Sequence, residues 1–128
     1  MINILIASHS HKLAEGLKDL IGQMAGDVNI GYSGGTEDGE LGSNFEEISE
    51  KMTRLAEDGV VVFFDLGSSM MNCEMAYDML EDDLKENVLL AGSPLVESSV
   101  AIAVSIDENT TLDQIREQIA SYSLNKLS

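Results

Sequence analysis

The sequence predicts a single α/β domain with a mainly parallel central sheet and helices on both faces. Short apolar segments alternate along the chain with segments of helical periodicity, which is the pattern of strand–helix–strand units. The apolar segments are nearly continuous, as expected of strands that are buried on both faces. Since 128 residues, 44% of them hydrophobic, suit one domain, we expect residues 1–128 to form one unit with strand order 2-1-3-4.

The first strand and the first helix are expected within the first 26 residues. Residues Met1–Ala7 (MINILIA) are apolar almost without interruption, so this strand is placed in the centre of the sheet. Apolar residues then recur with helical spacing until Gly26 ends the pattern. The residues of this stripe are Leu13, Ala14, Leu17, Leu20, Ile21 and Met24.

A second strand and helix follow, with a long loop between them. The strand is expected at Val28–Tyr32, and the glycine-rich, acidic segment Ser33–Ser43 (SGGTEDGELGS) is predicted to be the loop. Ser43 and Glu46 have the spacing of a capping box and therefore predict the start of a helix. The apolar stripe of that helix consists of Phe45, Ile48, Met52 and Leu55.

The third strand has the clearest pattern in the sequence. Residues Val60–Asp65 (VVVFFD) are β-branched or aromatic until they reach one carboxylate. The helix after them is expected to begin just past the tight connection Leu66–Ser69 (LGSS). Its inward side chains are predicted to be core residues, namely Met71, Met75, Met79 and Leu80.

The last third of the chain predicts one strand and two helices. The strand is expected at Val88–Gly92, and Ser93 with Pro94 is predicted to open a helix that reaches about Ile106. Thr111 and Gln114 predict a capping box for the last helix. Its apolar residues are Leu112, Ile115 and Ile119.

Composition narrows the classes of function. Seven basic and 23 acidic residues give a net charge of −16, which would repel a nucleic acid, so we expect none as a partner. The charge favours solubility and is also compatible with an acidic face for a basic protein partner. The single cysteine, Cys73, and the absence of a long apolar run predict a cytoplasmic protein without membrane insertion.

Two polar residues are predicted to meet where the crossovers diverge. Ligands of open parallel sheets bind beyond the carboxyl ends of the strands, and the strand order places the crevice between the first and third strands. His9 follows the first of these strands and Asp65 ends the other. Either residue alone would suit a solvated loop or a helix cap, but the two together indicate a functional site.

The chemistry of this pair suits a phosphoryl group carried on histidine. A neutral imidazole is a nucleophile, and a carboxylate can hold its other ring nitrogen. Donors for the phosphoryl oxygens are expected from the start of the helix after His9 and from two glycine-containing loops. The predicted binding residues are Ser10, Gly34, Gly35, Thr36, Gly67, Ser68 and Ser69.

The sequence supports other kinds of functional site less well. His11 is expected on the surface of the first helical turn, and a metal site made of His9, His11 and Asp65 has no signature spacing. Cys73 is predicted to be a core residue rather than a nucleophile. No nucleotide-binding motif is present, and neither a resident cofactor nor a metal is expected. A signalling receiver domain would need an acidic pair after the first strand, where this chain has histidine.

Four segments carry a resemblance to a known family. The segments IASHS, GGTEDGELGS, FFDLGSSMMN and AGSPLVE occur in that order. Together they resemble the phosphotransferase subunits of phosphoenolpyruvate-dependent dihydroxyacetone kinases, whose core domain is similar to the mannose-type IIA domains of the bacterial sugar phosphotransferase system. The likeness spans roughly the whole chain.

The resemblance implies a function and partners. His9 would accept a phosphoryl group from the phosphocarrier protein HPr and pass it to ADP on the kinase's nucleotide-binding subunit, in support of dihydroxyacetone phosphorylation. It also implies a role for Asp65 beside His9 and a homodimer. Longer relatives carry an HPr-like domain, so we expect this chain to use a separate HPr. Because the docking surface of HPr is often basic, we expect the acidic charge on outer helix faces such as Asp78 and Glu81–Asp83, with a less acidic rim near His9. The alternative is a sugar-specific mannose-type IIA domain that passes its phosphate to a IIB subunit.

The sequence departs from that family at two places. His11 stands where a small polar residue is more usual, and Ser98 and Ser99 stand where glycine and alanine are more usual. The first departure leaves open which histidine lies in the crevice.

Overall fold

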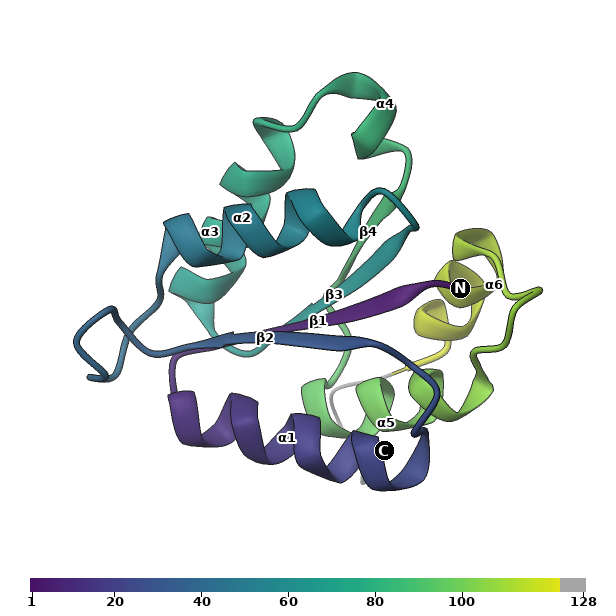
Figure 1. Ribbon diagram of the computed structural model, residues 1–128, viewed down its shortest axis with the longest axis horizontal. Coiled ribbons are helices and arrows are strands. Elements are labelled where there is room, and N and C mark those ends of the chain that lie inside the picture. Colours follow the sequence, from purple (N-terminus) through teal and green to yellow (C-terminus); the bar gives the residue numbers. More distant parts are fainter. Residues whose placement is uncertain (123–128) are drawn as a thin grey trace.

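A four-stranded sheet lies between two layers of helices in the computed structural model, which describes residues 1–122 (Figure 1). All pairings are parallel and the strand order is β2-β1-β3-β4, as predicted. The strands are β1 (Asn3–Ser8), β2 (Ile30–Gly34), β3 (Val60–Phe64) and β4 (Val88–Ala91). β1 and β2 begin two residues later than predicted, so Ser33 and Gly34 belong to a strand rather than to the loop.

The helices divide into one group on each face of the sheet (Figure 1). One face is covered by α1 (His11–Met24), α5 (Leu95–Ser105) and α6 (Leu112–Ala120). The other is covered by α2 (Phe45–Leu55), α3 (Gly67–Asp78) and the short α4 (Asp82–Lys85). The sequence did not predict α4, because four residues are too few to show a helical period. No helix of the described chain is long and apolar enough to cross a membrane.

The central strand explains the continuous apolar run at the start of the chain. All six residues of β1 are buried. Ile4 and Ile6 pack into the core on the α1 side, whereas Leu5 and Ala7 pack into the core on the α2 side. Because successive side chains of a strand point to opposite faces, a strand covered on both sides has consecutive apolar residues, here Ile4–Ala7, with the polar Asn3 and Ser8 at its two ends.

The inward residues of α3 differ from the prediction. Met71, Met75 and Met79 are exposed, and Leu80 alone of the four predicted core residues is buried. The buried positions of α3 are instead small, namely Ser69, Cys73 and Ala76. Small side chains let a helix approach the sheet closely, so the larger methionines point outward. In α1 likewise, Leu13, Leu20 and Met24 are exposed while Ala14, Leu17 and Ile21 are buried.

Two of the predicted helix caps are also corrected. Asn44, not Ser43, caps α2 and accepts a hydrogen bond from the amide of Glu47 at 3.1 Å. The Ser43 hydroxyl instead accepts a hydrogen bond from the Asn72 side chain of α3 at 2.8 Å.

The last two helices begin differently from each other. Pro94 stands at the cap of α5, and the Ser93 hydroxyl forms a hydrogen bond with Ser98 at 2.7 Å. Ser93 therefore bonds to the side chain of Ser98 within α5 and does not cap the first amides of the helix. The predicted capping box of Thr111 and Gln114 is confirmed at the start of α6.

Candidate active site

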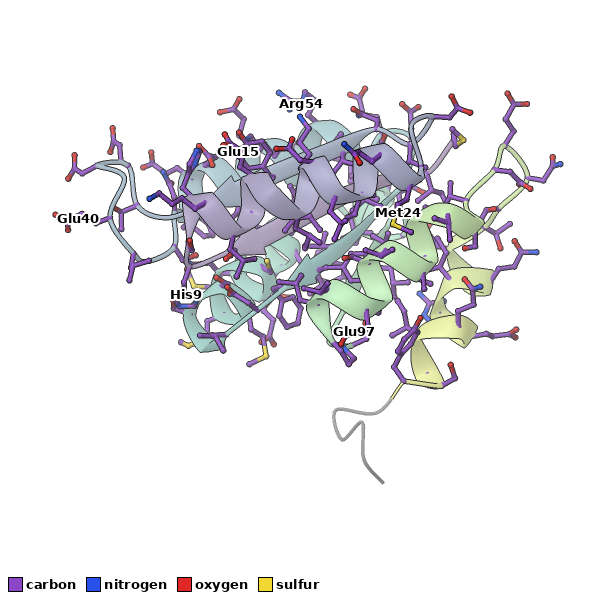
Figure 2. All side chains as sticks on the ribbon, turned by 90° about the horizontal axis from the view of Figure 1, so that it is seen from below. His9, Glu15, Met24, Glu40, Arg54 and Glu97 are labelled. Atoms are coloured by element: carbon purple, nitrogen blue, oxygen red, sulfur yellow. The ribbon has the colours of Figure 1, made fainter. Side chains whose placement is uncertain are left out.

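The carboxyl ends of β1 and β3 bring His9 and Asp65 together, as the sequence predicted. The two strands are neighbours in the sheet, and each of these residues follows the last residue of its strand. His9 Nδ1 lies 3.0 Å from Asp65 Oδ1. Figure 2 shows His9 at the edge of the molecule, beside the start of α1. This is the divergence point of the crossovers, where open parallel sheets hold their ligands.

Asp65 is fixed by four hydrogen-bond donors. The Ser8 hydroxyl and the His9 amide donate to Oδ2 at 2.6 and 3.0 Å, and the Leu66 amide donates to Oδ1 at 2.6 Å, beside the ring of His9. Burial alone would raise the pKa of Asp65, but these hydrogen bonds outweigh it and lower the pKa to about 2. Asp65 is therefore a carboxylate, which can only accept hydrogen bonds, across the physiological pH range.

The charge of Asp65 determines the tautomer of His9. Because the carboxylate accepts a hydrogen bond, the neutral imidazole carries its proton on Nδ1 and keeps a lone pair on Nε2. The Ser68 hydroxyl donates a hydrogen bond to Nε2. Ser69 Oγ lies 3.1 Å from Nδ1 and can accept a second hydrogen bond from the Nδ1–H group that Asp65 also binds. The His9 side chain is 25% exposed. Its contact with Ser68 at Nε2 lies at the surface, whereas the contacts of Nδ1 with Asp65 and Ser69 are partly buried, so a partner can reach Nε2 more readily than Nδ1. This arrangement suits nucleophilic attack through Nε2.

Two helices begin beside this imidazole. Gly67, Ser68 and Ser69 form the first turn of α3, although the sequence predicted them in the connection before that helix. Ser10 caps α1 by accepting a hydrogen bond from the Leu13 amide at 3.2 Å. First-turn amides have no acceptor within their helix, and they favour an anion close to the helix N-terminus. Of the predicted binding residues, Ser68 and Ser69 thus contact the imidazole, whereas the hydroxyl of Ser10 caps α1.

The loop after β2 packs against the backbone that carries His9. A Cβ on Gly34 would come within 2.4 Å of the Ser10 carbonyl oxygen, so only glycine allows β2 to pass this close to the start of α1. Thr36 closes the loop on itself through two hydrogen bonds with Glu40. The Gly42 amide donates to the His9 carbonyl oxygen at 2.8 Å. Gly34, Gly35 and Thr36 line a neighbouring pocket with His11 and Lys51 rather than surrounding the ring of His9.

The second histidine is directed elsewhere. His11 is the first residue of α1, and its Nε2 lies 3.3 Å from Glu15, with both side chains about half exposed. It therefore does not join His9 and Asp65 as a third ligand, and residues 1–122 contain no group of three or more His, Cys, Asp or Glu side chains arranged to hold a metal. His11 is a surface residue, as predicted.

Cys73 is unsuited to nucleophilic chemistry. The residue is fully buried in the core between α3 and the sheet. Burial, together with the negative charges of Asp65 and Glu74, raises the pKa of its thiol to about 12. The thiol is therefore protonated at neutral pH, and the prediction of a core residue is confirmed.

The sequence did not predict the role of Ser8. Its hydroxyl donates to Asp65 and accepts a hydrogen bond from the Ser10 amide at 3.0 Å. Ser8 thereby connects the carboxylate to the backbone that carries His9. A polar residue at the end of an otherwise apolar strand was the available signal, since a buried hydroxyl needs a partner.

Comparisons with known proteins identify related sequences and a related structure. The profile of the family described as "PTS system fructose IIA component" matches residues 3–116. A protein of Listeria innocua, named PEP-dependent dihydroxyacetone kinase 2, phosphoryl donor subunit DhaM, is 36% identical over 94% of this chain and 98% of its own length. A Lactococcus lactis protein named PTS-dependent dihydroxyacetone kinase, phosphotransferase subunit DhaM, is 31% identical over 96% of this chain and 97% of its own.

Longer relatives and a solved structure add to these matches. The Escherichia coli phosphoryl donor subunit DhaM is 31% identical over 90% of this chain, which spans 25% of that protein. A crystal structure of a protein described as of unknown function superposes over the whole of both chains with a TM-score of 0.83 and 32% identity. The chain therefore belongs to the mannose-type IIA family of the phosphotransferase system and, within it, to the DhaM-type subunits.

Proposed function

We propose that His9 carries a phosphoryl group from HPr to ADP held by the nucleotide-binding subunit of a dihydroxyacetone kinase. The observation that supports this most directly is the His9 ring, with Nδ1 held by Asp65 at 3.0 Å and Nε2 accessible. The names of the relatives, which are phosphoryl donor subunits of dihydroxyacetone kinases, support the same assignment. The dihydroxyacetone itself would be phosphorylated by the kinase and not by this chain.

The reaction consists of two transfers at one nitrogen. In the first, the lone pair of His9 Nε2 forms a bond to phosphorus, and the P–N bond of the phosphorylated donor breaks with its electron pair returning to the donor. In the second, a terminal oxygen of the ADP β-phosphate forms a P–O bond, and the electron pair of the P–Nε2 bond returns to His9. The ring stays cationic while it is phosphorylated, and the carboxylate of Asp65 stabilises that charge.

The first turn of α3 supplies the groups that we assign to the phosphoryl oxygens. The Ser68 hydroxyl, which donates to Nε2 in the free protein, has to leave that nitrogen when it is phosphorylated and can then donate to a phosphoryl oxygen. The amides of Gly67 and Ser68 lie in the first turn, where helix amides favour anions. We assign Ser10, Gly34, Gly35 and Thr36, which the sequence predicted as binding residues, to support of the backbone around His9.

The competing function is a sugar-specific IIA domain whose acceptor is a IIB subunit. Both functions use the same histidine, so labelling of His9 does not separate them. The protein should be charged with phosphoenolpyruvate, enzyme I and HPr, separated from them, and then offered either the kinase subunit with ADP or a mannose-type IIB subunit. Rapid ATP formation supports the kinase role, whereas transfer to IIB alone would refute it.

The identity of the phosphorylated histidine is tested separately with two variants. His9→Ala should not be phosphorylated by HPr, and His11→Ala should be phosphorylated like the wild type.

Two further features are proposed for the working protein. We expect a homodimer, as the family resemblance implies, which light scattering of the purified protein would test. We also expect it to act in the cytoplasm, which agrees with a buried, unpaired Cys73.

A further inference from the structure

Exposed apolar side chains are concentrated around α3. Residues 1–122 contain twelve large hydrophobic side chains that are exposed, and five of them lie between Leu66 and Met79. Such a concentration on one short segment exceeds the scattered exposure that every protein surface shows. It therefore marks a surface that another molecule can cover.

Three of these side chains form a stripe that begins at the active site. Met71, Met75 and Met79, called here the methionine stripe, are 60%, 50% and 72% exposed. They follow Ser68 at intervals of three, four and four residues, so they share one face of the helix with the hydroxyl that contacts His9 Nε2. The stripe extends about 16 Å from this contact along the helix axis. Figure 2 shows side chains that end in sulfur projecting outward near His9.

Two further exposed leucines lie in the segments next to His9 and Asp65. Leu66, at the start of α3, is 65% exposed, and Leu41, in the loop after β2, is 79% exposed. The neighbour of Leu41, Gly42, donates to the His9 carbonyl oxygen, and the Ser43–Asn72 hydrogen bond ties the same loop to α3. Exposed apolar side chains thus belong to two segments that are hydrogen-bonded to His9 or to Asp65. A partner that covers them would exclude water from the transfer and so limit hydrolysis of the phosphoryl group.

The surroundings of the stripe restrict what can cover it. Exposed carboxylates lie along the same helix and just after it, at Glu74, Asp78 and Glu81, on a chain with a net charge of −16. A matching partner presents apolar side chains next to cationic groups. A subunit that holds ADP needs cationic groups beside the diphosphate, and those groups must come close to His9 during transfer. Methionine side chains suit a partner that binds and leaves repeatedly, because they adapt their shape.

We infer that the methionine stripe of α3 is the docking surface for the kinase subunit that holds ADP. This inference rests on the proposed function and adds the surface through which the acceptor reaches His9. The stripe orients the acceptor along α3 so that the β-phosphate of ADP faces Nε2.

The test uses the phosphorylated protein and the kinase subunit loaded with ADP. Met71→Gln/Met75→Gln replaces two methionines by polar side chains of similar length that keep the helix propensity. Met24→Gln is the matched control, because Met24 is 56% exposed at the far end of α1 from His9 (Figure 2). ATP formation is measured against the concentration of the kinase subunit. The double variant should raise the half-saturating concentration about tenfold or more, with the saturated rate within about twofold of the wild type.

The remaining measurements separate this inference from the proposed function. Charging of the double variant by HPr should stay within about twofold of the wild type, and its molar mass by light scattering should be unchanged. An unchanged half-saturating concentration would overturn the docking surface while ATP formation by the wild type still supported the function. An equal loss in charging by HPr, or a changed molar mass, would assign the stripe to the donor or to a second copy instead. Absence of ATP formation by the wild type would refute the proposed function itself.

Discussion

Asp65 contacts His9 twice, through the backbone amide and through ring Nδ1, at 3.0 Å in each case. The first contact places the residue and the second orients the ring. Since the carboxylate can only accept, it leaves Nε2 as the basic nitrogen. The Ser8 hydroxyl, 2.6 Å from the same carboxylate, keeps Asp65 in this position. The reactivity of His9 therefore depends on a residue 56 positions away in the chain.

The Asp65→Asn variant tests the role of the carboxylate in catalysis. An amide can present its NH₂ group to Nδ1, which favours the tautomer with the proton on Nε2, and it no longer stabilises the cationic phosphorylated ring. We expect the rate of phosphorylation by HPr to fall at least about a hundredfold. Rapid-quench labelling would measure it, with Asp27→Asn, at an exposed position just after α1, as the control. A rate within twofold of the wild type would show that Asp65 does not orient the nucleophile.

The low pKa of Asp65 also predicts how stability depends on pH. The pKa of this carboxyl is about 2 in the folded protein against an ordinary value of 3.8, so the folded state favours the ionised form. The stabilisation, roughly 2 kcal/mol, is fully present above about pH 5 and is lost as the pH falls toward 2. Urea unfolding at several pH values should show this loss in the wild type and a smaller one in Asp65→Asn. Equal declines in both proteins would contradict it.

At the scale of secondary structure, the site depends on how closely β2 passes the start of α1. A Cβ on Gly34 would lie 2.4 Å from the Ser10 carbonyl oxygen and 2.8 Å from the Cα of His11. These are backbone atoms at the point where α1 begins, and His9 immediately precedes them. A larger residue at this position would have to displace the segment that carries the nucleophile.

The Gly34→Ala variant should therefore lose both stability and activity. We expect the free energy of unfolding to fall by about 2 kcal/mol or more, because the strand or the helix must shift. Gly22→Ala is the matched control, since a Cβ there has no atom within 4 Å and alanine favours a helix interior by up to about 1 kcal/mol. Denaturant unfolding measures both. A Gly34→Ala protein as stable as the wild type would show that the close approach is not required.

The sequence predicted the strands and their order because both depend on strong local patterns. Continuous apolar runs specify strands buried on two faces, and alternating elements specify parallel pairing, which together brought His9 and Asp65 to one crevice. The same reasoning failed on α3. Hydrophobic periodicity favours the largest apolar residues, but contact with the sheet selected Cys73 and Ala76 and left the methionines outside.

The finer features of the site depend on contacts that a sequence does not display. The choice of Asn44 over Ser43 as the cap of α2 depends on Asn72, which uses the Ser43 hydroxyl. The role of Ser8 depends on where Asp65 lies after folding. Each of these is a hydrogen bond between distant segments, and local spacing carries no information about it.

At the scale of the whole molecule, net charge and the site act together. The chain has a net charge of −16, and the side chains of Asp78, Glu81, Asp82 and Asp83 are exposed, as predicted. A basic phosphoryl donor would be attracted over a distance, which accelerates encounter without tight binding. This is what a carrier that alternates between two partners requires.

Salt should therefore slow charging by a protein donor. We expect the second-order rate constant for phosphorylation by HPr to fall about tenfold between 50 and 500 mM salt, because screening shortens the range of the attraction. Phosphoramidate, a small anionic donor, provides the comparison, since salt should relieve its repulsion and leave its rate equal or higher. A protein donor that is insensitive to salt would refute electrostatic steering.

The position of the phosphoryl group on the imidazole tests the central claim most directly. Protein labelled with ¹⁵N in histidine and charged through HPr can be examined by ³¹P and ¹⁵N NMR, which identify the nitrogen bonded to phosphorus. We predict a single phosphohistidine, substituted at Nε2 of His9, that is absent from His9→Ala and retained in His11→Ala. Phosphorus on Nδ1, or on His11, would contradict the claim that Asp65 binds Nδ1 of His9 and leaves Nε2 to accept the phosphoryl group.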